Sequence, residues 1–92
     1  MKADKTWTFL SNHGHVLVYI SRYPEARVKE IADEIGITER SAQSILHELQ
    51  ESGYITITKL GRRNTYRINP KGKFRHPSEK GKSIGSLLEI FI

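Results

Sequence analysis

Side chains that can make several directed hydrogen bonds recur along one stretch of the chain. At about 100° per residue they share one side of a helix, with Arg40, Ser44 and His47 at its centre and Gln43 and Glu48 on its flanks. A pair of adjacent arginines, Arg62-Arg63, follows further along the chain. Guanidinium, amide and imidazole groups in such positions suit the binding of a polar or anionic partner. The sequence therefore indicates that these two groups of side chains bind a polar or anionic partner.

The stretch from Val28 to Gly53 predicts two helices joined by a tight turn. Each helix has one apolar stripe with i, i+3, i+4, i+7 spacing: Val28, Ile31, Ala32 and Ile35 in the first, and Ala42, Ile45, Leu46 and Leu49 in the second. Gly36 suits the left-handed cap that ends the first helix, and Thr38 is a hydroxyl N-cap for the second. Two such helices form a helix-turn-helix unit, whose second helix commonly enters a DNA major groove. The alternative is an ordinary helical hairpin in a small core.

After Gly53 the apolar period changes from 3.6 to 2, which predicts strands at 54–60 and 65–69. Residues 61–64 form a predicted four-residue loop, in which Gly61 and Asn64 tolerate positive φ. The result is a hairpin that rests its apolar face on the helices and carries Arg62-Arg63 at its tip. Paired arginines there suit a phosphate backbone or a narrow minor groove. The alternative is a solvated surface turn.

A further helix is predicted before this unit. Ser11 or Asn12 caps it, it runs to about Tyr23, and its inner face is formed by His13, Val16, Leu17 and Ile20. Residues 25–27 are a short connector to the next helix, which has no good N-cap. Before the first helix, the alternation Thr6-Trp7-Thr8-Phe9 places Trp7 either over the protein's own core or against a second subunit.

Two segments follow the hairpin. Residues 70–82 have no apolar period, so they are predicted to be irregular, with Phe74 as their anchor. Ile84, Leu87, Leu88 and Phe91 return to helical spacing and predict a short apolar helix. So much apolar surface requires cover, either from the protein's own domain or from a symmetry mate.

Length and charge restrict the class of protein further. A chain of 92 residues is one domain by length, and the absence of cysteine excludes disulfides and thiolate chemistry. The net charge of +5 is segregated: residues 1–58 carry −2, whereas residues 59–82 carry +8. A basic block of this kind favours nucleic acid, with an acidic membrane surface second. No apolar run is long enough for a membrane span or signal-peptide core, so we expect a soluble cytoplasmic protein.

The order of these elements resembles the winged helix-turn-helix domain of bacterial and archaeal transcriptional regulators of the MarR/ArsR type. The resemblance covers about residues 11–69 and rests on Ile31-Ala32, Gly36-Ile37-Thr38, Ile45-Leu46, Leu49, Gly53-Tyr54-Ile55 and Gly61-Arg62-Arg63. It implies an α+β, mainly helical fold with a three-helix core, a two-stranded β-hairpin wing and a short C-terminal helix. We expect residues 1–69 to form this domain with an N-terminal arm, and residues 70–92 to form the basic segment and the C-terminal helix.

The resemblance also implies roles for individual residues. Thr38 and Ser41 would meet backbone phosphates, and Arg62 and Arg63 would reach the minor groove, with Asn64 beside them. The residues that would face base edges in the major groove are Arg40, Gln43, Ser44 and His47. Arg40 could pair with guanine and Gln43 with adenine, each pair contributing ~1–3 kcal/mol of discrimination.

The sequence departs from the MarR/ArsR pattern in two respects. Glu39, Glu48 and Glu51 make the recognition helix net acidic, because Arg40 is its only Lys or Arg. Most non-specific affinity for DNA is then expected from the wing and from residues 71–82. The long dimerisation helices that flank a typical MarR core are expected to be missing or reduced to one short C-terminal helix, and no separate effector domain is expected.

Three classes of function remain to be compared. The first is a sequence-specific regulator that binds double-stranded DNA as a homodimer on an inverted repeat, with RNA binding as a minor variant. The second is a winged-helix module that docks on another protein without reading bases. The third, an enzyme or metalloprotein, is disfavoured because His13 and His15 diverge by roughly 200° on a helix and no nucleophile motif is present. We therefore predict no catalytic residue, metal or cofactor, and leave a small-molecule effector open.

Overall fold

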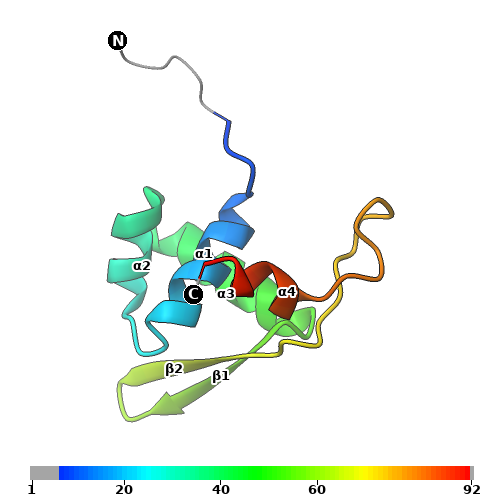
Figure 1. Ribbon diagram of the computed structural model, residues 1–92. Coiled ribbons are helices and arrows are strands. Elements are labelled where there is room, and N and C mark those ends of the chain that lie inside the picture. Colours follow the sequence, from blue (N-terminus) through cyan, green and yellow to red (C-terminus); the bar gives the residue numbers. More distant parts are fainter. Residues whose placement is uncertain (1–6, 92) are drawn as a thin grey trace.

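The computed structural model describes residues 7–91, so the predictions that involve Thr6 or Ile92 lie outside it. The element order is α1 Asn12–Arg22, α2 Val28–Ile35, α3 Glu39–Glu51, β1 Ile55–Leu60, β2 Arg63–Ile68 and α4 Ile84–Glu89. The first three helices pack against one another, the hairpin extends along one side of them, and α4 returns to the helical bundle (Figure 1). This is the winged helix-turn-helix arrangement that the sequence predicts.

The helix ends are fixed by local hydrogen bonds. The Ser11 hydroxyl accepts from the Gly14 N–H at 3.3 Å and caps α1, which ends before Pro24 as predicted. Gly36 ends α2 with a φ of 84°, a left-handed conformation that glycine adopts without steric cost. The start of α2 has no capping hydroxyl, but the Glu30 carboxylate accepts from the Arg27 N–H at 2.7 Å.

The core is a single cluster that joins all the elements. Its buried members are Val16, Leu17, Ile20, Ala26, Ile31, Ala32, Ala42, Ile45, Leu46, Leu49, Ile55, Tyr66, Ile84 and Leu88. The stripe predicted for α3 is fully buried, and that of α1 is buried except at one position. The prediction that His13 faces the interior is wrong, because its side chain is 47% exposed. His13 lies in the first turn of α1, beyond the edge of the core.

The wing is an antiparallel pair in which Ile55 faces Ile68 and Ile57 faces Tyr66. These four residues share the face that packs on the helices, as the period of two predicts. The predicted four-residue loop at 61–64 is wrong, since the turn consists of Gly61 and Arg62 alone. Gly61 has a φ of 65° and is followed by a residue of negative φ, so the strands meet through a tight turn of the II′ kind. Asn64 therefore needs no positive φ and lies within β2.

Hydrogen bonds at three points hold the wing in place. The Tyr66 N–H donates to the Pro24 carbonyl at 2.9 Å, so the connector before α2 pairs with β2. The Gln50 side chain accepts from the Ile57 N–H at 2.8 Å. The Asn69 amide donates to the Gly53 carbonyl at 3.0 Å. The orientation of the wing relative to α3 is therefore fixed at its base and along its length.

The segment after the wing is irregular, as predicted, but it is closely tied to the domain. Lys73 and Ser83 form an isolated antiparallel bridge, and Phe74 packs against the core. The apolar side of the C-terminal helix is covered by the protein's own domain and not by a symmetry mate, because Ile84 and Leu88 of α4 are buried in the common core. At Gly85 an added Cβ would lie 3.0 Å from the Pro70 carbonyl oxygen, so α4 approaches the chain closely there.

The segment before α1 is exposed. Trp7 is 63% exposed and Phe9 94% exposed, and their rings meet edge to face with centroids 5.3 Å apart. The alternative in which Trp7 covers the protein's own core is therefore wrong. Within residues 7–91, no helix has both the length and the apolar character needed to cross a membrane.

Candidate nucleic-acid interface

The outward face of α3 carries every polar residue that the sequence predicts there. Arg40, Gln43, Ser44 and His47 are all exposed, whereas the opposite stripe of the same helix is buried. A rigid helix thus presents donors and acceptors over about two turns without any competing core contact. Such a face can make hydrogen bonds to base edges.

Thr38 and Ser41 form the start of this helix. The Thr38 hydroxyl accepts from the Ser41 N–H at 3.0 Å and donates to the Ser41 hydroxyl at 3.0 Å. Both side chains are exposed, so the cap fixes the first turn while leaving it accessible. The N–H groups of that turn have no intrahelical acceptors and carry the positive end of the helix dipole, which favours an anion.

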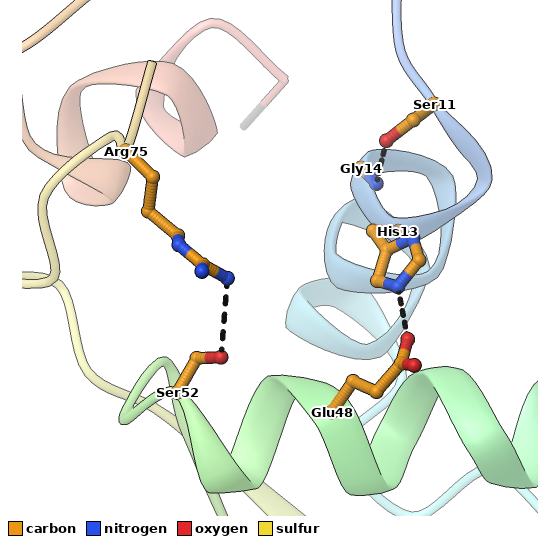
Figure 2. A network of polar contacts seen from close by, with 6 residues as sticks. All are labelled: Ser11, His13, Gly14, Glu48, Ser52 and Arg75. Atoms are coloured by element: carbon orange, nitrogen blue, oxygen red, sulfur yellow. Dashed lines mark hydrogen bonds and ion pairs between the residues drawn. The ribbon is translucent and has the colours of Figure 1, made fainter. Parts of the chain in front are cut away.

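Two of the three acidic residues of α3 lie against histidines. His13 Nε2 of α1 lies 2.6 Å from Glu48 Oε1 (Figure 2). On α3 itself, His47 Nε2 lies 3.9 Å from Glu51 Oε2. All four side chains are well exposed, so these pairs contribute little stability. The contact between His13 and Glu48 joins residues far apart in the chain, and no local pattern signals it.

The two wing arginines occupy different places. Arg62 is in the turn and exposed, whereas Arg63 is the first residue of β2 and donates from Nη2 to the Glu25 carbonyl at 3.2 Å. Asn64 is half-buried beside it. Residues 62–64 line one cavity together with Glu39 at the start of α3. The structure therefore brings the wing next to the start of α3.

The comparison with protein families decides the classification. The sequence profile of the MarR family matches residues 8–63, which is more than half of the chain. The chain belongs to the MarR family. Among curated proteins, no relative matches it in sequence.

Solved MarR-family structures share its fold. A point mutant of ZitR from Lactococcus lactis aligns with a TM-score of 0.58 at 19% identity, covering 77% of this chain and 50% of that one. Wild-type ZitR in complex with DNA aligns with a TM-score of 0.57 at 19% identity, covering 75% and 49%. A third structure, described as ZitR, a zinc-responsive MarR family member, gives 0.55 at 18% identity, covering 77% and 51%. The present chain thus spans about half the length of these neighbours.

The MarR match ends inside the wing. It includes α1, α2, α3, β1, the turn and Arg63, whereas Asn64 and the segment from 70 onward lie outside it. That segment forms a loop at the end of the molecule away from the wing tip (Figure 1). Its Arg75 points toward the last turn of α3, with Nη1 at 3.5 Å from the Ser52 hydroxyl (Figure 2). The +8 block that looks continuous in sequence is therefore divided between two separate surfaces of this MarR-family fold.

The remaining chemical possibility is a metal centre. Within residues 7–91, no group of three or more His, Asp or Glu side chains is arranged to hold a metal ion.

Proposed function

We propose that this MarR-family protein is a transcriptional regulator that binds double-stranded DNA sequence-specifically, with α3 in the major groove and the wing tip at the minor groove. The observation that carries the proposal is the face of α3, where four hydrogen-bonding side chains are exposed beside an arginine-bearing wing. A MarR-family protein of the same fold, ZitR, is described in complex with DNA, which supports the same class of partner here.

The exposed face of α3 supplies the proposed base contacts. Arg40 donates a bidentate pair to guanine and Gln43 exchanges hydrogen bonds with adenine, each pair discriminating by ~1–3 kcal/mol. Ser44 and His47 contact neighbouring base edges on the same face. Thr38 and Ser41 face backbone phosphates, where the positive end of the helix dipole adds to the attraction.

The wing supplies a separate contact. Arg62, exposed in the turn, enters the minor groove, where narrow stretches concentrate negative potential. Arg63 and Asn64 lie behind it on β2, closer to the sugar–phosphate backbone. The acidic residues of α3 repel DNA phosphates, so the tip of the wing provides a large part of the affinity.

We also propose that the regulator acts as a homodimer. Exposed apolar side chains occur in the segment before α1 and at the end of α4, namely Trp7, Phe9 and Ile90. Tyr19 of α1 lies close to Tyr23, with ring centroids 4.8 Å apart. Its pKa is raised above the ordinary value, first by burial and then by Glu34 and Glu30, so the phenol stays neutral at physiological pH. A two-fold dimer of this domain would bind an inverted repeat with half-sites about one helical turn apart.

We also propose that the chain divides into two parts. Residues 1–69 form the DNA-binding domain, and residues 70–92 form an attached basic segment with the C-terminal helix.

The second candidate is a protein-docking module. It is favoured by one observation, the excess of carboxylates on α3, where Glu39, Glu48 and Glu51 outnumber the single arginine. A module of this kind would use the same exposed helix face without reading bases.

Selection from a random duplex library separates the two candidates. The regulator enriches one inverted repeat, and Arg40→Ala and Gln43→Ala each relax preference at one base pair per half-site. Arg67→Gln, which removes a charge from the exposed face of β2, leaves the enriched sequence unchanged. Recovery of unrelated sequences with no common motif would contradict base readout and favour the docking module.

A further inference from the structure

A basic cavity lies between the start of α2, the start of α3 and the wing. Its volume is about 450 Å³, and it is lined by residues 25–29, Glu39, residues 62–64 and Tyr66. Four lining residues are cations, Arg27, Lys29, Arg62 and Arg63, and two are acids, Glu25 and Glu39. The cations thus outnumber the acids by two, which favours an anionic occupant.

The cavity walls are held by specific hydrogen bonds. Arg63 Nη2 donates to the Glu25 carbonyl at 3.2 Å, which keeps this guanidinium at the wall instead of at the hairpin tip. The Tyr66 N–H donates to the Pro24 carbonyl at 2.9 Å and joins β2 to the same connector. Lys29 Nζ pairs with Asp33 at 3.1 Å, but both side chains are exposed, so this pair is weak and readily exchanged.

Two features at the cavity point to a ligand with several acceptor oxygens. The N–H groups of Val28 and Lys29 in the first turn of α2 have no intrahelical acceptors and lie at the positive end of its dipole, whereas the Arg27 N–H is already bound by the Glu30 carboxylate at 2.7 Å. Tyr66 lines the cavity and is only 5% exposed, and its hydroxyl has no hydrogen-bond partner among the described residues. A buried hydroxyl without a partner is uncommon because it loses its hydrogen bonds to water.

We propose that this cavity binds one phosphate group, with the guanidiniums of Arg27 and Arg63 donating to its oxygens while Arg62 stays free to enter the minor groove. On DNA, the group is a backbone phosphate that lies between the groove read by α3 and the groove reached by the wing. The DNA part of this inference rests on the proposed function. It assigns Arg63 to the backbone instead of the minor groove, and it adds Arg27 and Tyr66, which carry no sequence signal for binding.

Salt-dependent binding to a 20-bp duplex of random sequence tests the site. Arg27→Gln and Arg63→Gln each remove one of the cations that neutralise this phosphate, so each makes the slope of log Kobs against log salt shallower, by at most about 0.9, the value for one phosphate. At 0.1 M salt this corresponds to binding weaker by at most about eightfold, because Kobs scales with salt to the same power. Tyr66→Phe weakens binding without changing the slope. The matched control is Arg67→Gln, which removes the same charge from the same strand outside the cavity and leaves the slope unchanged.

A second measurement distinguishes DNA phosphate from free phosphate. Inorganic phosphate is added to the ¹⁵N-labelled protein, and the amide signals of Val28, Lys29 and Glu30 are followed by NMR. Shifts that disappear in Arg27→Gln support the site whatever the source of the phosphate. Arg27→Gln is the main variant because Arg63→Gln also removes the bond to the Glu25 carbonyl, and thermal melts of each variant identify any loss of folding.

The outcomes separate this inference from the proposed function. If the wild type binds duplex and Arg27→Gln behaves like Arg67→Gln, the contact of this cavity with a DNA phosphate is refuted while DNA binding stands, and the phosphate titration then decides whether the cavity binds free phosphate. If the wild type does not bind duplex even at low salt, DNA binding fails, and the phosphate titration then decides. In that case shifts at residues 28–30 support a free-phosphate site, and their absence overturns the inference.

Discussion

Replacing Thr38 separates the two roles assigned to the start of α3. In the structure its hydroxyl accepts from the Ser41 N–H and donates to the Ser41 hydroxyl, both at 3.0 Å. Thr38→Ala removes both bonds and leaves the Ser41 N–H to be hydrated. Because the site is exposed, we expect the loss typical of an N-cap, about 1 kcal/mol, and little from the second bond.

The stability assay is thermal unfolding followed by circular dichroism. For a domain of this size, 1 kcal/mol lowers Tm by about 4–8 °C. Thr38→Ser keeps the capping oxygen and is the matched control, with an expected change within about 2 °C. Thr38→Asp also keeps a capping acceptor and places negative charge at the positive end of the helix dipole, so its Tm equals or exceeds that of the wild type.

DNA binding by the same variants tests the second role. If Thr38 faces a backbone phosphate, the carboxylate in Thr38→Asp repels that phosphate, and affinity falls although stability does not. Thr38→Ser retains both properties. A Thr38→Asp protein that binds duplex as tightly as the wild type would refute the placement of Thr38 at the backbone. An unchanged Tm in Thr38→Ala would refute the capping argument.

Three further predictions follow from particular contacts. Gly85→Ala places a Cβ 3.0 Å from the Pro70 carbonyl oxygen, so α4 or the chain at Pro70 must give by a few tenths of an ångström. Chemical denaturation should show a loss of about 1–3 kcal/mol, whereas an unchanged midpoint would mean that the chain at Pro70 yields freely. Tyr66→Phe removes a buried hydroxyl that has no hydrogen-bond partner among the described residues, so urea unfolding should show equal or slightly higher stability. A loss of stability above about 1 kcal/mol would mean that the hydroxyl is hydrogen-bonded in solution. Glu48→Gln removes an exposed carboxylate that contacts His13, so stability should change by less than about 1 kcal/mol. Affinity for duplex should rise because a negative charge that repels DNA is lost, and unchanged affinity would place this part of α3 away from DNA.

The helical part of the fold could be predicted from the sequence because its signals are local. The stripes of α2 and α3 are read directly from residue spacing, and Gly36 and Thr38 mark the helix ends. The change to a period of two after Gly53 placed the wing for the same reason. The turn length was missed because Arg63 and Asn64 carry no strong strand preference, and they pair with Leu60 and Lys59 only once Gly61 closes the turn.

The parts of the site that the sequence did not predict depend on contacts between distant residues. Arg63 meets the Glu25 carbonyl, and His13 meets Glu48, only because the helices and the wing pack in one particular way. The division of the basic block has the same origin, since residues adjacent in the sequence are carried to opposite ends of the molecule (Figure 1). The exposed face of α3 was predictable because one helix alone determines it.

The most direct test of DNA binding is fluorescence anisotropy of the wild-type protein on a random-sequence duplex, measured from low to physiological salt. We predict micromolar binding at low salt that weakens steeply as salt rises, because each phosphate contact releases counterions and contributes a slope of about −0.9. An absence of binding at low salt would contradict the proposed function. The exposed face of α3 would then be assigned to a protein partner.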